Sequence, residues 1–384
     1  MDGWGREQPV IYLDQAATSL QKPPEVVQSM LTASKTCAGY ARSGHAPALR
    51  AGEVVYTCRE MAAKLFSVDD PAKIIFTMNA THALNLAIHG FCTPQTTVAV
   101  SGYEHNSVMR PLHAIGCPIR ILRSRLFDCA DFLEQAKQAI DAGVQFFVIN
   151  HVSNVFGSII PLAQLDALLY ENHIPMILDA SQSAGAIPLD LQQLRSVCAV
   201  CMPGHKSLLG PQGTGLLILP GDTLPVPLIQ GGTGSASASL EQPAFLPDRL
   251  ESGTPNVPGI AGLCAGLEFL LTYGIERIQA EEQALKNQLV VWLQTIPELE
   301  VFFAPDTACQ AGVVSVRVPG QSSEILAQAL AEHDVCVRAG LHCAPLAHHS
   351  AGTERTGTIR FSISPYNTSF EIAQTIQILH DILG

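Results

Sequence analysis

Residues 176–219 read MILDASQSAGAIPLDLQQLRSVCAVCMPGHKSLLGPQGTGLLIL, and this stretch contains three short apolar runs at 176–178, 197–202 and 215–219. Short apolar runs bounded by Gly and Pro are typical of buried strands. Asp179 directly follows the first run, and Lys206 lies just after the second. Because functional groups gather at the carboxyl ends of parallel strands, we expect these two side chains at a sheet edge that faces a pocket.

The same pattern extends upstream. Further strand-like runs occur at 73–76, 97–100, 119–122 and 146–149, and amphipathic helical patterns occur at 81–91, 132–142 and 162–172. Alternation of strands and helices implies a mainly parallel sheet with helices on both of its faces. The sequence therefore predicts an α/β fold.

Downstream of ESGTPN at 251–256 the pattern changes. Helical patterns at 260–273, 275–296, 322–333 and 369–383 surround a strand-like run at 312–318. This order predicts a large domain over residues 13–258 and a smaller α+β domain over residues 259–384. We expect residues 1–12 to pack against the smaller domain, and residues 20–36, with a helix at 24–36, are a further candidate for the same surface.

Composition narrows the class of protein. Of the 384 residues, 47% are hydrophobic and 15% are charged, as in a well-packed globular enzyme. The net charge of −12 argues against a nucleic-acid or anionic-membrane partner. No stretch resembles an export signal or a membrane span, so we expect a cytoplasmic protein with 11 reduced cysteines. Cys198 and Cys201 form a CxxC inside a predicted strand with no second pair nearby, and we expect no metal site.

Lys206 and Asp179 have a specific chemical interpretation. An aldehyde cofactor needs a partly desolvated amine that is not permanently protonated, and a lysine at a sheet edge can supply one. An aspartate at the end of a buried strand suits a pyridinium nitrogen that must stay protonated. The alternatives are a surface lysine in a loop and an aspartate that caps a helix.

Nine segments carry a resemblance to a known family. They are YLDQAATS (12–19), NATHALNLA (79–87), EHNS (104–107), HVSNVFG (151–157), DASQSAG (179–185), GHK (204–206), ESGTPN (251–256), RAGLHCAP (338–345) and IRFSISPYNT (359–368). In this order they resemble the class V, fold-type I pyridoxal-phosphate (PLP) enzymes, and within them the cysteine desulfurase and selenocysteine lyase group. The resemblance runs almost end to end and implies a PLP-binding homodimer.

The resemblance implies roles for the residues around the cofactor ring. Lys206 would hold the cofactor aldehyde and later carry the α proton of the substrate. Asp179 would pair with the ring nitrogen, and Gln182 would reach the ring hydroxyl. His105 would stack on the ring and serve in proton transfer, the alternative being a core histidine. Asn154 would contact the ring hydroxyl or the substrate.

The phosphate needs a cradle of donors. Thr81 begins a predicted helix, whose N-terminus attracts anions, and His205 would add a second donor. In this family Thr254 completes the cradle from the neighbouring subunit. Two positions depart from the pattern. Pro203 stands where many relatives carry a phosphate-binding hydroxyl, a contact worth on the order of 1–3 kcal/mol. His82 stands where relatives commonly carry glutamate, which puts a contact across the subunits in doubt.

RAGLHCAP resembles the short-loop desulfurase branch. Its Cys343 would attack the sulfur of the substrate, keep it as a persulfide and release alanine. We expect Cys343 to begin a helical turn, with His342 and Arg338 favouring the reactive thiolate. The alternative for this residue is a buried hydrophobe. His348 and His349 are expected to be solvated residues at a helix end.

Arg360 matches the family's clamp for the substrate carboxylate, a task that suits a planar guanidinium. Its alternative is a surface ion pair. Arg338 would assist the same group or the cysteine loop, and His45 matches a histidine that reaches into the partner's site.

Three functions stay open at this stage. The first is a cysteine desulfurase that acts on L-cysteine and passes sulfur to an acceptor protein, with L-selenocysteine as the alternative substrate. The second is another class V enzyme, an aminotransferase or β-lyase, in which Cys343 is incidental. The third is a catalytically silent scaffold in a sulfur-transfer complex, which the presence of Lys206, Asp179 and His105 disfavours.

Overall fold

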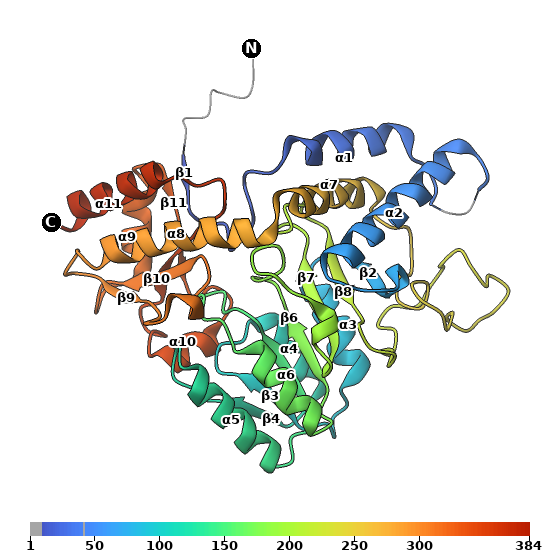
Figure 1. The fold of residues 1–384 in the computed structure, drawn as a ribbon, viewed down its shortest axis with the longest axis horizontal. Coiled ribbons are helices and arrows are strands. Elements are labelled where there is room, and N and C mark those ends of the chain that lie inside the picture. Colours follow the sequence, from blue (N-terminus) through green and yellow to red (C-terminus); the bar gives the residue numbers. More distant parts are fainter. Residues whose placement is uncertain (1–9, 41–42) are drawn as a thin grey trace.

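The computed structural model describes residues 10–40 and 43–384, and its central feature is a seven-stranded sheet (Figure 1). The strands are β2 (Ile74–Thr77), β3 (Val98–Ser101), β4 (Ile119–Leu122), β5 (Phe146–Asn150), β6 (Met176–Asp179), β7 (Val197–Pro203) and β8 (Gly215–Ile218). Their spatial order is β2-β8-β7-β6-β5-β3-β4, and only β8 runs against its neighbours. The structure confirms the predicted α/β fold with a mainly parallel sheet.

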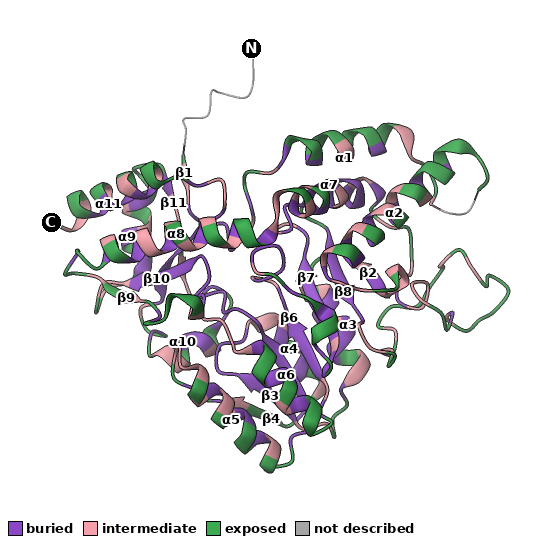
Figure 2. Cartoon of the chain, viewed as in Figure 1, coloured by how far each residue is buried: buried purple, intermediate pink, exposed green. Residues whose placement is uncertain are grey.

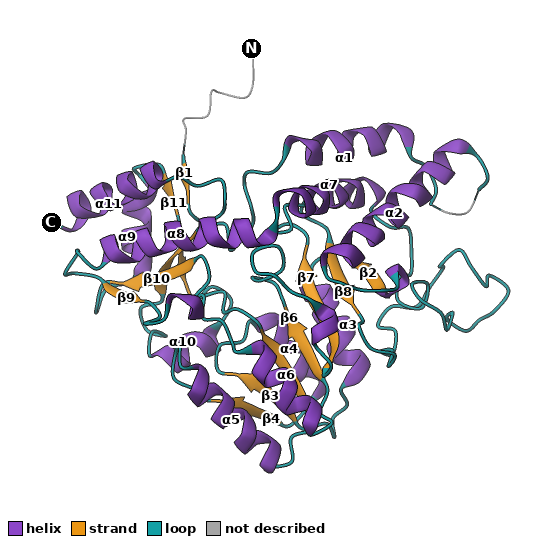
Figure 3. Ribbon diagram, viewed as in Figure 1, coloured by secondary structure: helices purple, strands orange, loops and turns teal. Residues whose placement is uncertain are grey.

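Helices cover both faces of this sheet (Figure 3). They are α2 (Ala46–Leu65), α3 (Ala80–Phe91), α4 (Asn106–Ile115), α5 (Cys129–Asp141), α6 (Leu162–Glu171) and α7 (Val257–Tyr273). Successive strand residues point to opposite faces. In β5, Phe146 and Val148 therefore pack with α3 and α4, whereas Phe147 and Ile149 pack with α2, α5, α6 and α7. Strands buried on both faces appear in the sequence as continuous apolar runs. For this reason the predicted strand bounds differ from the observed ones by at most one residue at each end.

A smaller antiparallel sheet follows in the C-terminal part of the chain. Its strands are β9 (Glu300–Phe302), β10 (Val313–Arg317), β12 (Arg338–Gly340) and β13 (Thr358–Ser362), in the order β12-β13-β10-β9. Helices α8 (Ile275–Leu293), α9 (Ser323–Ala331) and α11 (Ser369–Leu383) cover it through a separate apolar core, and α10 (Pro345–Ala351) connects β12 to β13. This part is the smaller α+β unit that the sequence predicts.

The start of the described chain joins this C-terminal part. Strand β1 (Ile11–Tyr12) pairs in parallel with β11 (Val335–Cys336), and Leu13 lies in the C-terminal core. The packing expected for residues 10–12 is therefore present, while residues 1–9 lie outside the described residues. The N-terminal segment thus reaches from the C-terminal sheet to the Lys206 loop, because Ser19 donates its backbone N–H to the carbonyl of His205 at 3.0 Å.

Helices α1 and α7 differ from the expected arrangement. Helix α1 (Pro24–Thr36) packs on α7, and α7 packs on α2. Ile260, Leu263 and Leu267 of α7 belong to the core of the large sheet. This packing favours a domain boundary later than residue 259, and it places residues 24–36 on the large domain rather than on the small one. Figure 2 shows the same contrast, because α7 is largely buried whereas the outer side of α1 is exposed.

Helix α8 connects the two parts of the molecule (Figure 1). Its Ile278 packs in the core of the large sheet, and its Leu289 and Leu293 pack in the C-terminal core. Within the described residues, no single helix has the length and hydropathy of a membrane span. Helices α7 and α8 meet that test only when they are taken together, and they are bent by 82° at their junction.

Candidate active site

A cavity of about 110 Å³ opens at the carboxyl ends of the central strands. Asn150 ends β5, Asp179 ends β6 and Pro203 ends β7, and all three residues line this cavity. Its other lining residues are Asn79, Ala80, Thr81, Leu84, His105, Ser107, Val152, Asn154, Ser181, Gln182, His205 and Lys206. Seven residues that the sequence singles out as cofactor ligands therefore line one cavity, from Thr81 on α3 to Lys206 after β7.

Lys206 lies in the loop after β7. Burial and the neighbouring Arg360 guanidinium lower the pKa of its amine to about 8, although the Asp179 carboxylate acts in the opposite direction. A substantial fraction of this amine is therefore neutral near physiological pH, as attack on an aldehyde requires. The loop packs against the turn after β6 at Gly185, whose φ is +89°. A Cβ at Gly185 would lie 2.3 Å from the carbonyl oxygen of Ser207, so only glycine allows this approach.

Asp179, Gln182 and Asn154 line the cavity as well. Asp179 is buried, and its Oδ1 accepts the backbone N–H of Ser181 at 2.9 Å. Gln182 donates from Nε2 to the carbonyl of Ala16 at 3.1 Å. The Oδ1 atom of Asn154 is buried without a hydrogen-bond partner in the described chain. Such an acceptor is costly unless a bound group donates to it, so this cavity is suited to a polar ligand.

His105 is the N-cap residue of α4. Its Nδ1 accepts the backbone N–H of Ser107 at 3.0 Å, and burial lowers its pKa. The imidazole is therefore neutral, and because Nδ1 is an acceptor, the ring proton resides on Nε2. His105 consequently offers an N–H donor to whatever occupies the cavity. Its capping role and its role at the cavity use different ring atoms.

Thr81 and His205, the expected phosphate donors, line the cavity together with Ser107 and Pro203. Thr81 lies in the first turn of α3, and its hydroxyl is 2.8 Å from the hydroxyl of Ser107. Burial, reinforced by the charge of Lys206, lowers the pKa of His205 to about 4, and its Nδ1 is paired with Thr18 Oγ1 at 3.0 Å. Pro203 contributes neither a side-chain donor nor an N–H. The sequence analysis did not identify Ser107, although it lies in the EHNS segment.

Five of the expected site residues do not line the Lys206 cavity, namely Thr254, His45, Arg338, Arg360 and Cys343. Thr254 and His82 instead line a neighbouring cavity of about 700 Å³, together with Tyr40 and Asn79. Asn79 borders both cavities. His45 is the N-cap residue of α2, where its Nδ1 accepts the N–H of Ala48 at 3.3 Å. The resemblance assigns Thr254 and His45 to the partner's site, and this assignment stays a prediction.

Arg360 is 1% exposed and lies on β13, outside the lining of the cavity. Its Nη1 donates to the carbonyl of Asn154 at 2.9 Å, and its Nη2 donates to Asp14 Oδ1 at 2.7 Å. Arg338 lies directly opposite on β12, with its Nε 3.4 Å from Asp14 Oδ2. Asp14 therefore neutralises two cations, a role that the sequence analysis missed although Asp14 lies in YLDQAATS. The Nε atom of Arg360 is buried and has no partner in the described chain.

Cys343 is exposed and is held beside the cavity. Its carbonyl accepts the backbone N–H of Asn106 at 2.8 Å, next to His105. Asn154 donates from Nδ2 to the carbonyl of His342 at 2.8 Å. His342 and Cys343 both have positive φ, at 48° and 55°, a strained conformation for residues other than glycine. Cys343 does not begin a helical turn as expected, because α10 begins at Pro345.

The histidines near Cys343 differ from the prediction. His342 is buried, and its Nε2 lies 3.1 Å from the carbonyl of Thr358. Burial and the charge of Arg360 hold its pKa well below the usual range, so it is neutral and gives no cationic support to a thiolate. His348 is buried as well, with its ring centroid 5.6 Å from that of His342, so the expected solvated position is wrong for this residue. His349 is exposed, as predicted.

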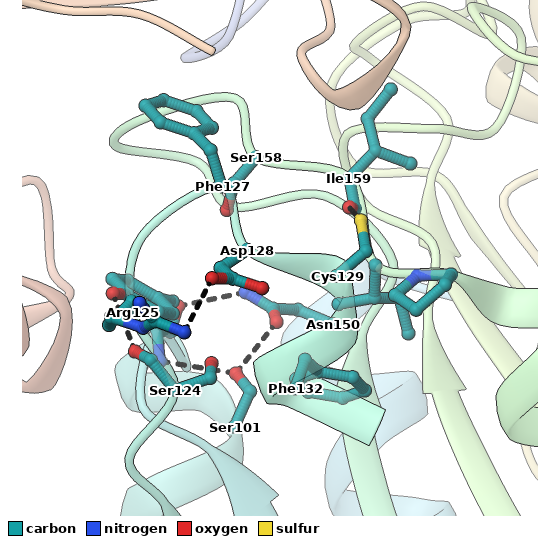
Figure 4. A pocket seen from close by; sticks show the side chains of 13 residues that line it. Ser101, Ser124, Arg125, Phe127, Asp128, Cys129, Phe132, Asn150, Ser158 and Ile159 are labelled. Atoms are coloured by element: carbon teal, nitrogen blue, oxygen red, sulfur yellow. Dashed lines mark hydrogen bonds and ion pairs between the residues drawn. The ribbon is translucent and has the colours of Figure 1, made fainter. Parts of the chain in front are cut away.

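A smaller cavity is lined by Ser101 and by Asn150, which also borders the Lys206 cavity (Figure 4). Its polar groups already bind one another. Ser101 donates to Asn150 Oδ1 at 2.9 Å, and Arg125 forms an ion pair with Asp128 at 2.8 Å. This arrangement supports the sheet edge and leaves the Lys206 cavity as the better candidate for chemistry.

The chain belongs to the aminotransferase class-V family, whose model matches residues 11–374. Enzymes of this family depend on PLP. The chain is 29% identical to a probable cysteine desulfurase of Methanothermobacter thermautotrophicus, a match that covers 97% of this chain and 95% of that protein. It is also 29% identical to a cysteine desulfurase of Escherichia coli, over 98% of this chain and 95% of the relative.

Solved structures agree with this family. The apo structure of a cysteine desulfurase from Thermococcus onnurineus superposes with a TM-score of 0.90 at 28% identity, over 97% of this chain and 94% of that one. The E. coli cysteine desulfurase CsdA, in an S-sulfonic acid form, gives a TM-score of 0.86 at 26% identity, over 98% and 96% of the two chains. The protein is thus a class V PLP enzyme related to cysteine desulfurases.

The cavity residues fit PLP. Lys206 offers a partly neutral amine, and Asp179 offers a carboxylate at the end of a buried strand. The unpartnered Oδ1 of Asn154 can accept a hydrogen bond from a ring hydroxyl or from a substrate amine. Two helix N-termini, those of α3 and α4, border the end where a phosphate would lie.

Proposed function

We propose that this protein is a cysteine desulfurase that converts L-cysteine to L-alanine and holds the released sulfur on Cys343. The observation that carries the proposal is the attachment of the Cys343 segment to the cavity wall. Asn154 lines the cavity and binds the carbonyl of His342, while the residue after His105 binds the carbonyl of Cys343. An exposed thiol is therefore positioned beside the place where substrate chemistry would occur.

When bound, PLP supplies an electron sink that weakens the bonds at the substrate's α carbon. Lys206 would hold the cofactor and, once released by the substrate amine, would carry the α proton. A pKa of about 8 allows its amine both to take and to give a proton near neutral pH. Asp179 would keep the ring nitrogen protonated, because a carboxylate beside that nitrogen favours the charged form.

Arg360 would bind the substrate carboxylate. Asp14 and the carbonyl of Asn154 each occupy one N–H of its terminal nitrogens, and its Nε remains without a partner. The guanidinium therefore keeps donors for a carboxylate, and its orientation is determined before the substrate arrives. This preorganisation reduces the entropy lost on binding.

Cys343 would then accept the sulfur. Its thiolate attacks the substrate sulfur, an S–S bond forms, and the bond between that sulfur and the β carbon breaks. A proton supplied within the cavity completes alanine, and Cys343 is left as a persulfide, so the step needs no external oxidant. His105 is placed to donate a hydrogen bond, because its proton resides on Nε2. The exposed position of Cys343 lets an acceptor protein reach the persulfide.

We further propose a homodimer. Thr254 lies outside the cavity of its own chain, in the adjoining 700 Å³ cavity that Asn79 also borders. The rim of this cavity includes Met78, which is 59% exposed, and the exposed Ile229. A second copy of the chain placed here would cover apolar surface and bring its Thr254 toward the phosphate end.

Mass spectrometry of the Cys343 peptide tests the proposal. After incubation with PLP and L-cysteine, and without a reductant, this peptide should gain the mass of one sulfur atom. The peptide that carries Cys129 is an internal control and should stay unchanged. The gain should vanish in Lys206→Ala, which retains Cys343 but lacks the amine. Sulfur bound equally at several cysteines, or bound in Lys206→Ala, would contradict the assignment. L-Selenocysteine is the second substrate to be compared in the same experiment.

A further inference from the structure

Ser107 lies where the first turns of α3 and α4 approach each other. Its hydroxyl is 2.8 Å from the hydroxyl of Thr81, and both side chains line the Lys206 cavity. Thr81 is the second residue of α3, and Ser107 is the second residue of α4. Each helix N-terminus carries unpaired N–H groups and a partial positive charge. The two hydroxyls therefore stand between two helix ends that both favour an anion.

The charge pattern of the cavity makes neutral donors necessary. Lys206 is the only Lys or Arg among the described residues that line it, and in this enzyme class its amine binds the cofactor aldehyde. The pKa of His205 is lowered to about 4, so this residue is neutral at physiological pH. A phosphate here must be held by hydroxyl and N–H donors rather than by a cation.

Pro203 leaves a gap among those donors. It ends β7, lines the same cavity and contributes neither a hydroxyl nor an N–H. Thr81, His205 and Ser107 are the remaining side chains at this end that can donate. Thr81 and Ser107 are at present hydrogen-bonded to each other, and an anion between them could accept from both.

We propose that Ser107 is a phosphate-binding residue of this enzyme and that, with Thr81, it supplies the donor that position 203 lacks. The inference rests on the proposed PLP site but does not depend on which reaction the enzyme performs.

The neighbouring histidine offers a competing explanation. Ser107 Oγ also lies 3.0 Å from His105 Nδ1, so the hydroxyl could serve only to orient that ring. The backbone N–H of Ser107 binds the same Nδ1 at 3.0 Å and is retained in Ser107→Ala. The variant therefore removes the hydroxyl while it keeps the N-cap bond. A ligand without a phosphate then separates the two explanations.

The test compares PLP with pyridoxal, which lacks the phosphate. Binding of each compound to cofactor-stripped full-length protein is measured by visible absorbance at equilibrium. In Ser107→Ala, the dissociation constant of PLP should rise roughly tenfold, as expected for one hydrogen bond to a charged group, while that of pyridoxal stays unchanged. Ser181→Ala is the matched control, because Ser181 also lines the cavity, beside Asp179. In this variant the ratio of the dissociation constants of PLP and pyridoxal should equal that of wild type.

A second variant tests whether a hydroxyl at position 203 can replace the hydroxyl of Ser107. Pro203→Ser places a hydroxyl at position 203 of the same cavity, and in the Ser107→Ala background it should recover most of the lost PLP affinity. Equal weakening of PLP and pyridoxal would assign Ser107 to the orientation of His105 and overturn the proposal. An unchanged dissociation constant of PLP in Ser107→Ala would also overturn the proposal. A wild-type protein that binds no PLP would do the same. Wild type that binds PLP yet releases pyruvate would refute the desulfurase assignment alone.

Discussion

Asp14 joins two arginines that face each other on neighbouring strands. Its Oδ1 accepts from Arg360 Nη2 at 2.7 Å, and its Oδ2 lies 3.4 Å from Arg338 Nε. Arg338 and Arg360 are directly paired across β12 and β13, where two like charges would repel. The opening segment of the chain thus supplies the anion that lets Arg360 remain charged and oriented at the cavity.

Asp14→Asn should weaken substrate binding more than it slows turnover. The amide keeps an acceptor for Arg360 but removes the negative charge, so the two guanidinium groups repel and the clamp loses its orientation. We expect KM for L-cysteine to rise about tenfold, with PLP absorbance retained. Steady-state kinetics measure this split. A fall in kcat at unchanged KM would show that Asp14 does not act through the clamp.

The pair Arg59–Glu251 should contribute strongly to stability. Arg59 Nη2 lies 2.5 Å from Glu251 Oε2, and Glu251 Oε1 accepts the N–H of Phe76 at 2.6 Å. Both side chains are largely buried, so Glu251→Ala leaves an unpaired buried guanidinium and should lower the free energy of unfolding by about 3–5 kcal/mol.

Urea unfolding measures this loss. The exposed pair Arg277–Glu281 on α8 is the control, and Glu281→Ala should cost about 0.5 kcal/mol or less. If the two variants lost similar amounts of unfolding free energy, burial of the Arg59–Glu251 pair would add nothing to the stability of the protein. Because Glu251 begins the ESGTPN segment, its loss should also disturb the position of Thr254.

Glu104 should make stability depend on pH. It is fully buried, its Oε2 has no partner in the described chain, and burial raises its pKa to about 8 from the ordinary value of 4.5. Between these values the folded state binds the proton and the unfolded state does not. The contribution of Glu104 is therefore fully present below pH 4.5 and is lost as the pH rises through 8.

Glu104→Gln removes this titration. The difference in unfolding free energy between variant and wild type should shift in favour of the variant by at least about 1.4 kcal/mol, the equivalent of one pKa unit, across that range. Urea unfolding at several pH values measures it. A difference that is constant with pH would contradict the assigned protonation.

Capture of PLP should follow the protonation of Lys206. The neutral amine attacks the aldehyde, so the rate of capture should rise with pH and level off above about 8. Arg360 lowers the pKa of Lys206, so Arg360→Met should move the midpoint to higher pH. Absorbance changes on mixing PLP with cofactor-stripped protein give the profile. A midpoint that does not move would show that Arg360 does not influence the lysine.

The sequence predicts the large sheet well because its strands are buried on both faces and read as uninterrupted apolar runs. Helix α4 is missed because its segment, NSVMRPLHAI, carries Pro111 and begins with polar residues. The strand-like run at Arg360 corresponds to β13, whereas its neighbour β12 is missed. Arg338 begins β12 opposite Arg360, and Asp14, more than 300 residues away from either, neutralises both arginines in the sheet.

The residues of the site also differ in how well the sequence predicts them. Lys206 and Asp179 are predictable because residues after parallel strands meet at one edge of the sheet, whereas Asn154 is predicted only through the family resemblance. Asp14 and Ser107 act through contacts between distant segments, which no local pattern reveals. His342 and His348 are misjudged because HCAPLAHHS reads as polar and exposed, whereas tertiary packing buries two of its histidines.

The most direct test of the account is the product balance with L-cysteine. Purified protein with PLP and a reductant is given L-cysteine, and alanine, pyruvate and sulfide are quantified for wild type, Lys206→Ala and Cys343→Ser. We expect wild type to release alanine and sulfide in equal amounts, and both variants to release neither. Pyruvate in place of alanine, or turnover unchanged in Cys343→Ser, would contradict sulfur transfer through Cys343.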